Sequence, residues 1–164
     1  MDSEKKVSVL FICMGNICRS PTAEGFFRKA AQDAGVADRF RIESAGTHAY
    51  HSGAPPDRRA QEAAERRGVT LGAIRARRIT DEDFETFDYI LVMDKDNLGE
   101  LLKRAPERHR SKIQLFLEYA GSHGGAEVPD PYYGGASGFE LVLDLVEQGS
   151  ERLLQRIRDG KPWR

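Results

Sequence analysis

Short apolar runs alternate along the chain with longer stretches in which apolar residues recur every three or four positions. Four runs rich in β-branched and aromatic residues predict strands, at 7–12, 40–44, 89–93 and 113–117. The stretches between and after them have the spacing of helices that cover a core with one face. This alternation predicts an α/β fold built on a parallel sheet.

Helix start and stop signals divide the stretches between the strands. The helix after the first strand is expected to begin at Ser20, a plausible N-cap, with Pro21 in the first helical position, and to end at Gly35. Asp57 is expected to cap a second helix that ends at Gly68. These residues therefore predict the bounds of the two helices that flank the second strand.

Two capping-box patterns mark further helices. Thr80 with Asp83 predicts a short helical turn, and Ser137 with Glu140 predicts the start of a final helix. Gly149 lies within the apolar stripe of that helix and is expected to bend it. A further helical stretch is expected after the third strand.

Together these elements predict a single three-layer domain over residues 1–164, with a central four-stranded, parallel, twisted sheet and helices on both faces. A chain of 164 residues with 40% hydrophobic residues can bury one sizeable core. In such folds ligands bind beyond the carboxyl ends of the strands. The loop after the first strand is therefore expected to contain ligand-binding or catalytic residues.

Charge and cysteine content narrow the classes of protein. The 25 Lys and Arg nearly balance the 26 Asp and Glu, so no nucleic-acid partner is expected. The apolar runs are too short for a membrane span, and no membrane insertion is expected. Two cysteines are too few for a disulfide framework and favour a reduced, cytoplasmic setting.

The loop C-M-G-N-I-C-R-S, Cys13 to Ser20, places a thiol and a guanidinium six positions apart, between a strand and a helix. If the loop curls, its backbone N–H groups and the helix N-terminus can converge on one oxyanion. Gly15 and Asn16 tolerate the backbone angles that a curl requires. The segment therefore predicts a phosphate-binding loop.

Within this loop Arg19 can hold two phosphate oxygens at once, and its charge favours the thiolate form of Cys13. Cys13 is therefore the predicted nucleophile. The competing interpretation is a small buried cysteine at the end of a core strand. The loop matches neither G-x-x-x-x-G-K-[ST] nor G-x-G-x-x-G, the two common nucleotide-binding patterns.

Other polar residues carry weaker signals. No metal or cofactor is expected, because the four histidines lack metal-ligand spacing and are expected to be solvated. The basic run Arg75, Arg77 and Arg78 is typical of a solvated face, although it could also meet an acidic phosphopeptide. The histidines are His48, His51, His109 and His123.

With its C-x5-R-S loop after the first strand, the chain resembles the low-molecular-weight phosphotyrosine protein phosphatase family. The resemblance covers nearly the whole chain. It continues through S-A-G-T at 44–47, G-x-P-P-D at 53–57, R-x-I-T at 77–80, D-Y-I-x-x-M-D at 88–94 and D-P-Y-Y-G at 130–134.

The resemblance implies a metal-free protein-tyrosine phosphatase that forms a phosphocysteine intermediate on Cys13. It implies Arg19 as phosphate clamp and Asp130 as general acid and then base. A protonated leaving group and an activated water are what phosphotyrosine hydrolysis requires. By composition alone, Asp130 before Pro131 would be a turn residue. The implied partners are phosphotyrosine proteins or peptides, with inorganic phosphate as product and a monomer or weak dimer as the assembly.

The resemblance also implies a set of substrate-binding residues. Three tyrosines are expected to wall the cleft around a flat aryl ring, with ordinary packing as their alternative. Ser20 is expected to hydrogen-bond the nucleophile as well as to cap the helix. The set is Met14, Gly15, Asn16, Ile17, Cys18, Ser20, Tyr50, Tyr132 and Tyr133.

Four residues bear on how far the resemblance goes. Ile74 stands where many relatives carry a histidine that buttresses the loop, so Asn16 must be held in another way. Arginine phosphatases tend to have Thr at the position of Ile17, and arsenate reductases of this fold need a third thiol beyond Cys18. A catalytically inactive phosphate-binding module would not need a general acid, so the presence of Asp130 argues against this alternative. Cys18 is either a packed thiol on the loop or a partner that forms a reversible disulfide with Cys13. The second interpretation is favoured and would make the protein redox-sensitive.

Overall fold

The computed structural model describes residues 5–121, 127–131 and 135–161. The elements in these ranges are β1 (Val7–Cys13), α1 (Arg19–Asp33), η2 (Ala37–Arg39), β2 (Phe40–Gly46), α2 (Arg58–Glu65), α3 (Asp81–Thr86), β3 (Tyr89–Val92), α4 (Lys95–Arg104), η3 (Glu107–Lys112), β4 (Ile113–Leu115), α5 (Phe116–Tyr119) and α6 (Gly135–Asp159).

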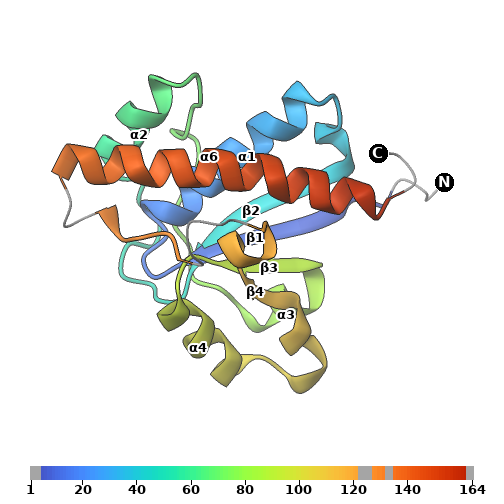
Figure 1. Ribbon diagram of the computed structural model, residues 1–164. Helices are drawn as coiled ribbons and strands as arrows, with labels where there is room; N and C mark the ends of the chain where they lie inside the picture. The colour runs from blue at the N-terminus through green and yellow to red at the C-terminus, as the bar shows by residue number, and fades with distance from the viewer. Residues whose placement is uncertain (1–4, 122–126, 132–134, 162–164) are drawn as a thin grey trace.

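The strands form one parallel sheet in the order β2-β1-β3-β4. Helices α1, α2 and α6 lie on one face of this sheet, and α3 and α4 lie on the other (Figure 1). The predicted α/β fold, with four parallel strands between two helical layers, is confirmed. The pairing of β1 with β2 ends at Cys13 opposite Gly46, so the loop after β1 starts beside the end of β2.

Strand β1 is buried on both faces because it lies between two apolar clusters. Val9 and Phe11 face α1 and α6, whereas Leu10 and Ile12 face the side covered by α3 and α4. The ring of Phe11 packs edge-on against that of Phe116, with 5.3 Å between centroids. This central strand fixes the position of the residue at its end, Cys13.

Helix starts follow the predicted caps in two places and depart from them in two others. Asp57 accepts a hydrogen bond from the Arg59 amide and caps α2, and Thr80 forms the expected capping box with Asp83. Helix α1, however, begins at Arg19, before Ser20, because the Ser20 hydroxyl is used inside the preceding loop. The final helix begins at Gly135, before the predicted Ser137 box.

The fourth strand is shorter than its apolar run suggested, because Phe116 and Leu117 belong to α5. Helix α6 packs closely against this short helix. A Cβ atom on Gly149 would lie 2.8 Å from Leu117 Cδ2 and 3.0 Å from Phe116 Cζ. Helix α6 continues through Gly149, whose missing side chain lets α6 approach α5.

In the described ranges, no helix combines the length and apolar character that crossing a bilayer requires.

Candidate active site

A cavity of about 340 Å³ opens at the carboxyl end of β1. The loop between β1 and α1 forms its floor. Residues from the segment between β2 and α2, and from the segment before α6, complete its wall. The lining residues are Cys13, Met14, Gly15, Ile17, Cys18, Arg19, His51, Asp57 and Asp130. The structure therefore brings Asp130 to the loop that holds Cys13 and Arg19.

The loop curls because of one left-handed residue. Asn16 has a φ of 60°, and it is the only non-glycine residue in the described ranges with positive φ. Gly15 has a different role from the predicted one. A Cβ atom on Gly15 would lie 3.1 Å from His51 Cδ2, so its small size leaves room for the imidazole. A Cβ atom on Gly46 would lie 2.6 Å from the Met14 carbonyl oxygen, so glycine there lets the loop lie against β2.

Cys13 is buried inside the curl, with 3% of its surface exposed. Its Sγ lies 3.0 Å from the Ser20 hydroxyl and accepts a hydrogen bond from the Asn16 amide at 3.3 Å. A thiolate at this position can accept both hydrogen bonds, and it lies before the N-terminus of α1. Ser20 thus makes the contact with Cys13 that the family resemblance implied, and it does not cap the helix.

Arg19 is buried and is oriented by two acceptors. Its Nη1 donates to Asp94 Oδ2 at 2.7 Å and to the Val128 carbonyl at 3.0 Å. Burial alone would lower the pKa of Arg19, but the charges of Cys13 and Asp94 outweigh it and raise the pKa. Asp94 also caps α4 by accepting from the Asn97 amide at 2.8 Å. The guanidinium is therefore held in place before any phosphate binds.

Two carboxylates line the cavity, and their surroundings differ. Asp57 is the N-cap of α2, and its amide donates to the Ile17 carbonyl at 2.7 Å. Burial raises the pKa of Asp57, but the hydrogen bonds and charge of Arg59 outweigh burial and bring the pKa below its usual value. Asp57 is thus tied to helix α2 as a charged group. Asp130 is exposed on the segment before α6.

Cys18 lines the same cavity as Cys13. Burial, followed by the charges of Asp57, Cys13 and Asp130, raises the pKa of Cys18 to about 12. Cys18 is therefore a neutral thiol at neutral pH, and both cysteines are free. Of the two thiols, Cys13 is the one with a hydroxyl and an amide directed at its sulfur.

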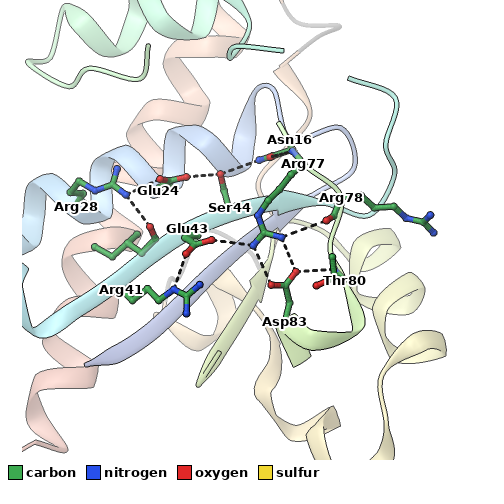
Figure 2. Close-up of polar contacts among 11 residues, drawn as sticks. Asn16, Glu24, Arg28, Arg41, Glu43, Ser44, Arg77, Arg78, Thr80 and Asp83 are labelled. Atoms are coloured by element: carbon green, nitrogen blue, oxygen red, sulfur yellow. Dashed lines mark hydrogen bonds and ion pairs between the residues drawn. The ribbon is translucent and has the colours of Figure 1, made fainter. Parts of the chain in front are cut away.

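The side chain of Asn16 is the centre of the network that holds the loop (Figure 2). Its Nδ2 donates to the hydroxyls of Ser20, at 2.8 Å, and Ser44, at 3.0 Å, while its Oδ1 accepts from the Arg77 amide at 3.0 Å. Ser44 in turn donates to Glu24 Oε1 at 2.6 Å. These contacts account for the buttress that the sequence left open at Ile74. Ile74 itself packs against the core.

The Arg77 amide is positioned by a second group of charges. The Arg77 guanidinium pairs with Asp83 at 2.8 Å and with Glu43 at 3.2 Å (Figure 2). Burial lowers the pKa of Arg77 and raises that of Asp83, but their mutual hydrogen bonds reverse both effects. Both groups are charged at neutral pH, so the segment that donates to Asn16 is fixed to β2 and α3.

The predicted aromatic wall is only partly described. Tyr50 is 69% exposed and stacks on His48, with 5.0 Å between ring centroids, and it does not line the cavity. Tyr132 and Tyr133 lie outside the described residues. His51, which was expected to be a solvated side chain, is exposed but also lines the cavity. Sequence reasoning missed His51, Ser44, Glu24 and Asp94, since no local pattern places them beside the loop.

A thiol and a guanidinium that share an anion-binding loop, with a carboxylate at its rim, define a site of the cysteine-dependent phosphatase class. No group of three or more potential metal ligands occurs within the described part of the chain. This class uses the thiolate as nucleophile and the loop as phosphate cradle.

Comparison with known proteins identifies the family. The family model described as "Low molecular weight phosphotyrosine protein phosphatase" matches residues 8–162. The low molecular weight protein-tyrosine-phosphatase YfkJ of Bacillus subtilis is 41% identical over 155 residues, covering 94% of this chain and 98% of the relative. The chain belongs to the low molecular weight phosphotyrosine protein phosphatase family. It is therefore a hydrolase of phosphoric monoesters.

Solved structures agree with this assignment. A protein tyrosine phosphatase from Entamoeba histolytica superposes with a TM-score of 0.90 at 40% identity, covering 94% of this chain and 99% of that one. A Drosophila arginine phosphatase superposes with a TM-score of 0.84 at 33% identity, covering 92% and 97%. The same scaffold thus occurs in enzymes named for two different phosphorylated side chains.

Replacing Ser44 by Ala tests the loop network. Removing the hydroxyl takes one of the two acceptors away from Asn16 Nδ2 and the donor away from Glu24 Oε1, which is expected to lower the free energy of unfolding by about 1–3 kcal/mol. Because the loop then loses its fixed shape, kcat/KM should fall about ten- to a hundredfold. Steady-state kinetics, measured well below the unfolding temperature, and inhibition by inorganic phosphate would check this.

Ser150 provides the matched control. It is 1% exposed, and its hydroxyl has no hydrogen-bond partner among the described residues. Ser150→Ala should therefore leave both kcat/KM and phosphate inhibition unchanged. Equal kinetics in Ser44→Ala and Ser150→Ala would show that the network does not shape the loop.

Proposed function

We propose that this protein hydrolyses phosphotyrosine in proteins through a phosphocysteine intermediate on Cys13. The observation that carries the proposal is the shared cavity, in which Cys13 and Arg19 line the floor and Asp130 lines the wall. Nucleophile, phosphate clamp and proton donor come from two distant parts of the chain. Phosphate binding alone would require only the loop with Cys13 and Arg19, and not Asp130.

In the first step the Cys13 thiolate attacks phosphorus, and the bond from phosphorus to the phenolic oxygen breaks. The loop amides and the Arg19 guanidinium hold the non-bridging oxygens as charge develops on them. Asp130 gives its proton to the leaving phenolic oxygen, which would otherwise depart as a poor leaving group. Asp57 is less suited to this role because its pKa is lowered and its carboxylate caps α2.

In the second step a water molecule attacks phosphorus and the bond to sulfur breaks. Asp130, now a carboxylate, takes the proton from the water, and inorganic phosphate leaves. The Ser20 hydroxyl, 3.0 Å from Cys13 Sγ, donates to the sulfur as it regains its negative charge. This contact lowers the cost of expelling the thiolate.

The cavity favours a flat aromatic substrate whose phosphate reaches the loop. Met14 and Ile17 give the cavity apolar contacts, and His51 lies over Gly15 at its edge. The aromatic wall formed by Tyr132 and Tyr133 stays a prediction. Tyr50 can join this wall if its ring leaves His48.

Further expectations from the sequence stay predictions. They are the cytoplasmic location, the monomeric or weakly dimeric state, the absence of a nucleic-acid partner, the absence of a cofactor, and the reversible oxidation of Cys13 with Cys18. The placement of both free thiols in one cavity supports the last of these.

Cys13→Ser tests the covalent intermediate. The variant should lose all measurable turnover, because a serine hydroxyl is a much weaker nucleophile toward phosphorus than a cysteine sulfur. Cys18→Ser is the matched control and should keep most of the activity. The check is acid quenching of enzyme mixed with ³²P-labelled phosphotyrosine peptide, where label should be trapped on the parent and on Cys18→Ser alone. Phosphoarginine peptides and arsenate run in parallel would reveal either rival activity, and turnover of phosphoarginine alone would refute the proposal.

Asp130→Asn tests the proton donor through the leaving group. Its kcat should fall about 10²- to 10⁴-fold for phenyl phosphate, which needs a proton, and much less for aryl phosphates with acidic phenols. Asp57→Asn serves as the control, because it should destabilise α2 without changing the dependence on leaving group. Parallel slowing of all substrates by Asp130→Asn would remove this residue as the acid.

His51→Ala tests the contact at the cavity edge. Since the imidazole lines the cavity but has no part in bond making, KM for a phosphotyrosine peptide should rise about two- to tenfold with kcat little changed. His48→Ala, which removes the ring that contacts Tyr50 and the Thr47 hydroxyl but does not line the cavity, should change KM less. A change confined to kcat would contradict this role for His51.

A further inference from the structure

Arg78 is the member of the basic run whose charge is not used inside the protein. The guanidinium of Arg77 pairs with Glu43 and Asp83, and that of Arg75 donates to two nearby backbone carbonyls. Arg78 is exposed, and its guanidinium makes no ion pair with any residue that the structure describes. Figure 2 shows its side chain projecting away from the ion pairs around Arg77.

Arg78 lines a second cavity, of about 370 Å³, which we call the Arg78 cavity. Its other lining residues are Ile79, Thr80, Asp81, Phe84 and Arg104. Ile79 and Phe84 are buried and form an apolar base. Arg104 is already engaged by the Thr47 carbonyl, at 2.7 Å, and by Glu100, at 3.2 Å. An anion entering this cavity would therefore meet Arg78 as its main cation, with Asp81 opposing it.

The Arg78 cavity adjoins the catalytic loop. The Thr47 amide donates to the Cys13 carbonyl at 2.9 Å, and the Thr47 carbonyl accepts from Arg104. Arg78 itself forms a parallel bridge with Gly46, the residue paired with Cys13. Two strand spacings, on the order of 10 Å, therefore separate the Cα atoms of Cys13 and Arg78. Three or four residues of extended peptide can cover such a span.

We propose that the Arg78 cavity receives an acidic side chain of the phosphoprotein substrate, three or four residues from the phosphotyrosine. This inference rests on the phosphotyrosine phosphatase function proposed above. The unpaired guanidinium offers two parallel N–H donors to a carboxylate, and the apolar base can pack against its methylene groups. The negative charge of Asp81 weakens the attraction between Arg78 and a substrate carboxylate. Removing the charge of Arg78 and removing that of Asp81 should therefore change kcat/KM for acidic peptides in opposite directions.

The experiment compares kcat/KM for phosphotyrosine peptides that carry Glu or Gln at the third and fourth positions, either N-terminal or C-terminal to the phosphotyrosine. On one of these two sides, the parent should have a higher kcat/KM for the Glu peptide than for the Gln peptide. Arg78→Gln should reduce kcat/KM for that peptide about two- to fivefold, the range of an exposed ion pair. Asp81→Asn should raise the preference, and added salt should remove it. Arg78→Lys should retain most of the preference, since it keeps the charge.

Arg110→Gln is the matched control, since it removes one exposed positive charge outside this cavity and should change nothing. Activity on p-nitrophenyl phosphate, which is too small to reach the Arg78 cavity, should be equal in all variants. Loss of that activity would count against the phosphatase mechanism rather than against the docking site. No Glu preference in the parent, an unchanged preference in Arg78→Gln, or an equal loss in Arg110→Gln would overturn the proposal.

Discussion

The left-handed backbone of Asn16 is the constraint on which the catalytic loop depends. A non-glycine residue in this conformation costs free energy, and it persists only where the surroundings fix it. Here the Asn16 side chain donates from Nδ2 to the hydroxyls of Ser20 and Ser44, and its Oδ1 accepts from the Arg77 amide. These buried contacts keep the loop curled around the sulfur of Cys13. The anion site is therefore built before substrate arrives, which is the condition for electrostatic stabilisation of a transition state.

Several charged groups around the loop also stabilise the helices that start there. Arg19 is oriented by Asp94, which at the same time caps α4. Asp57 caps α2 and stays charged, while Asp130 lies exposed at the cavity. Burial keeps Cys18 protonated beside Cys13. The helices that start beside the cavity thus hold its polar groups in position, and the fold and the chemistry share the same side chains.

Two neighbouring arginines near the site, Arg77 and Arg78, differ in what their side chains contact. The half-buried Arg77 pairs with Glu43 and Asp83 and so links β2 to α3. Arg78, one position further on, points away from these pairs and lines a cavity of its own. Neighbouring residues of one basic run therefore make different contacts, because successive positions of an extended segment face opposite sides.

The sequence by itself determined the parallel α/β fold, the loop from Cys13 to Ser20 and the caps at Asp57 and Thr80, because apolar periodicity and capping patterns are local properties. Through the family resemblance it also indicated Asp130, which the fold brings to the cavity. The resemblance likewise implied the contact between Ser20 and Cys13. Only the tertiary structure decided that Ser20 does not cap α1, that Ser44 and Glu24 replace the buttress missing at Ile74, and that His51 rather than Tyr50 lines the cavity. These contacts join residues far apart in the chain, and the packing of β2 against β1 brings them together.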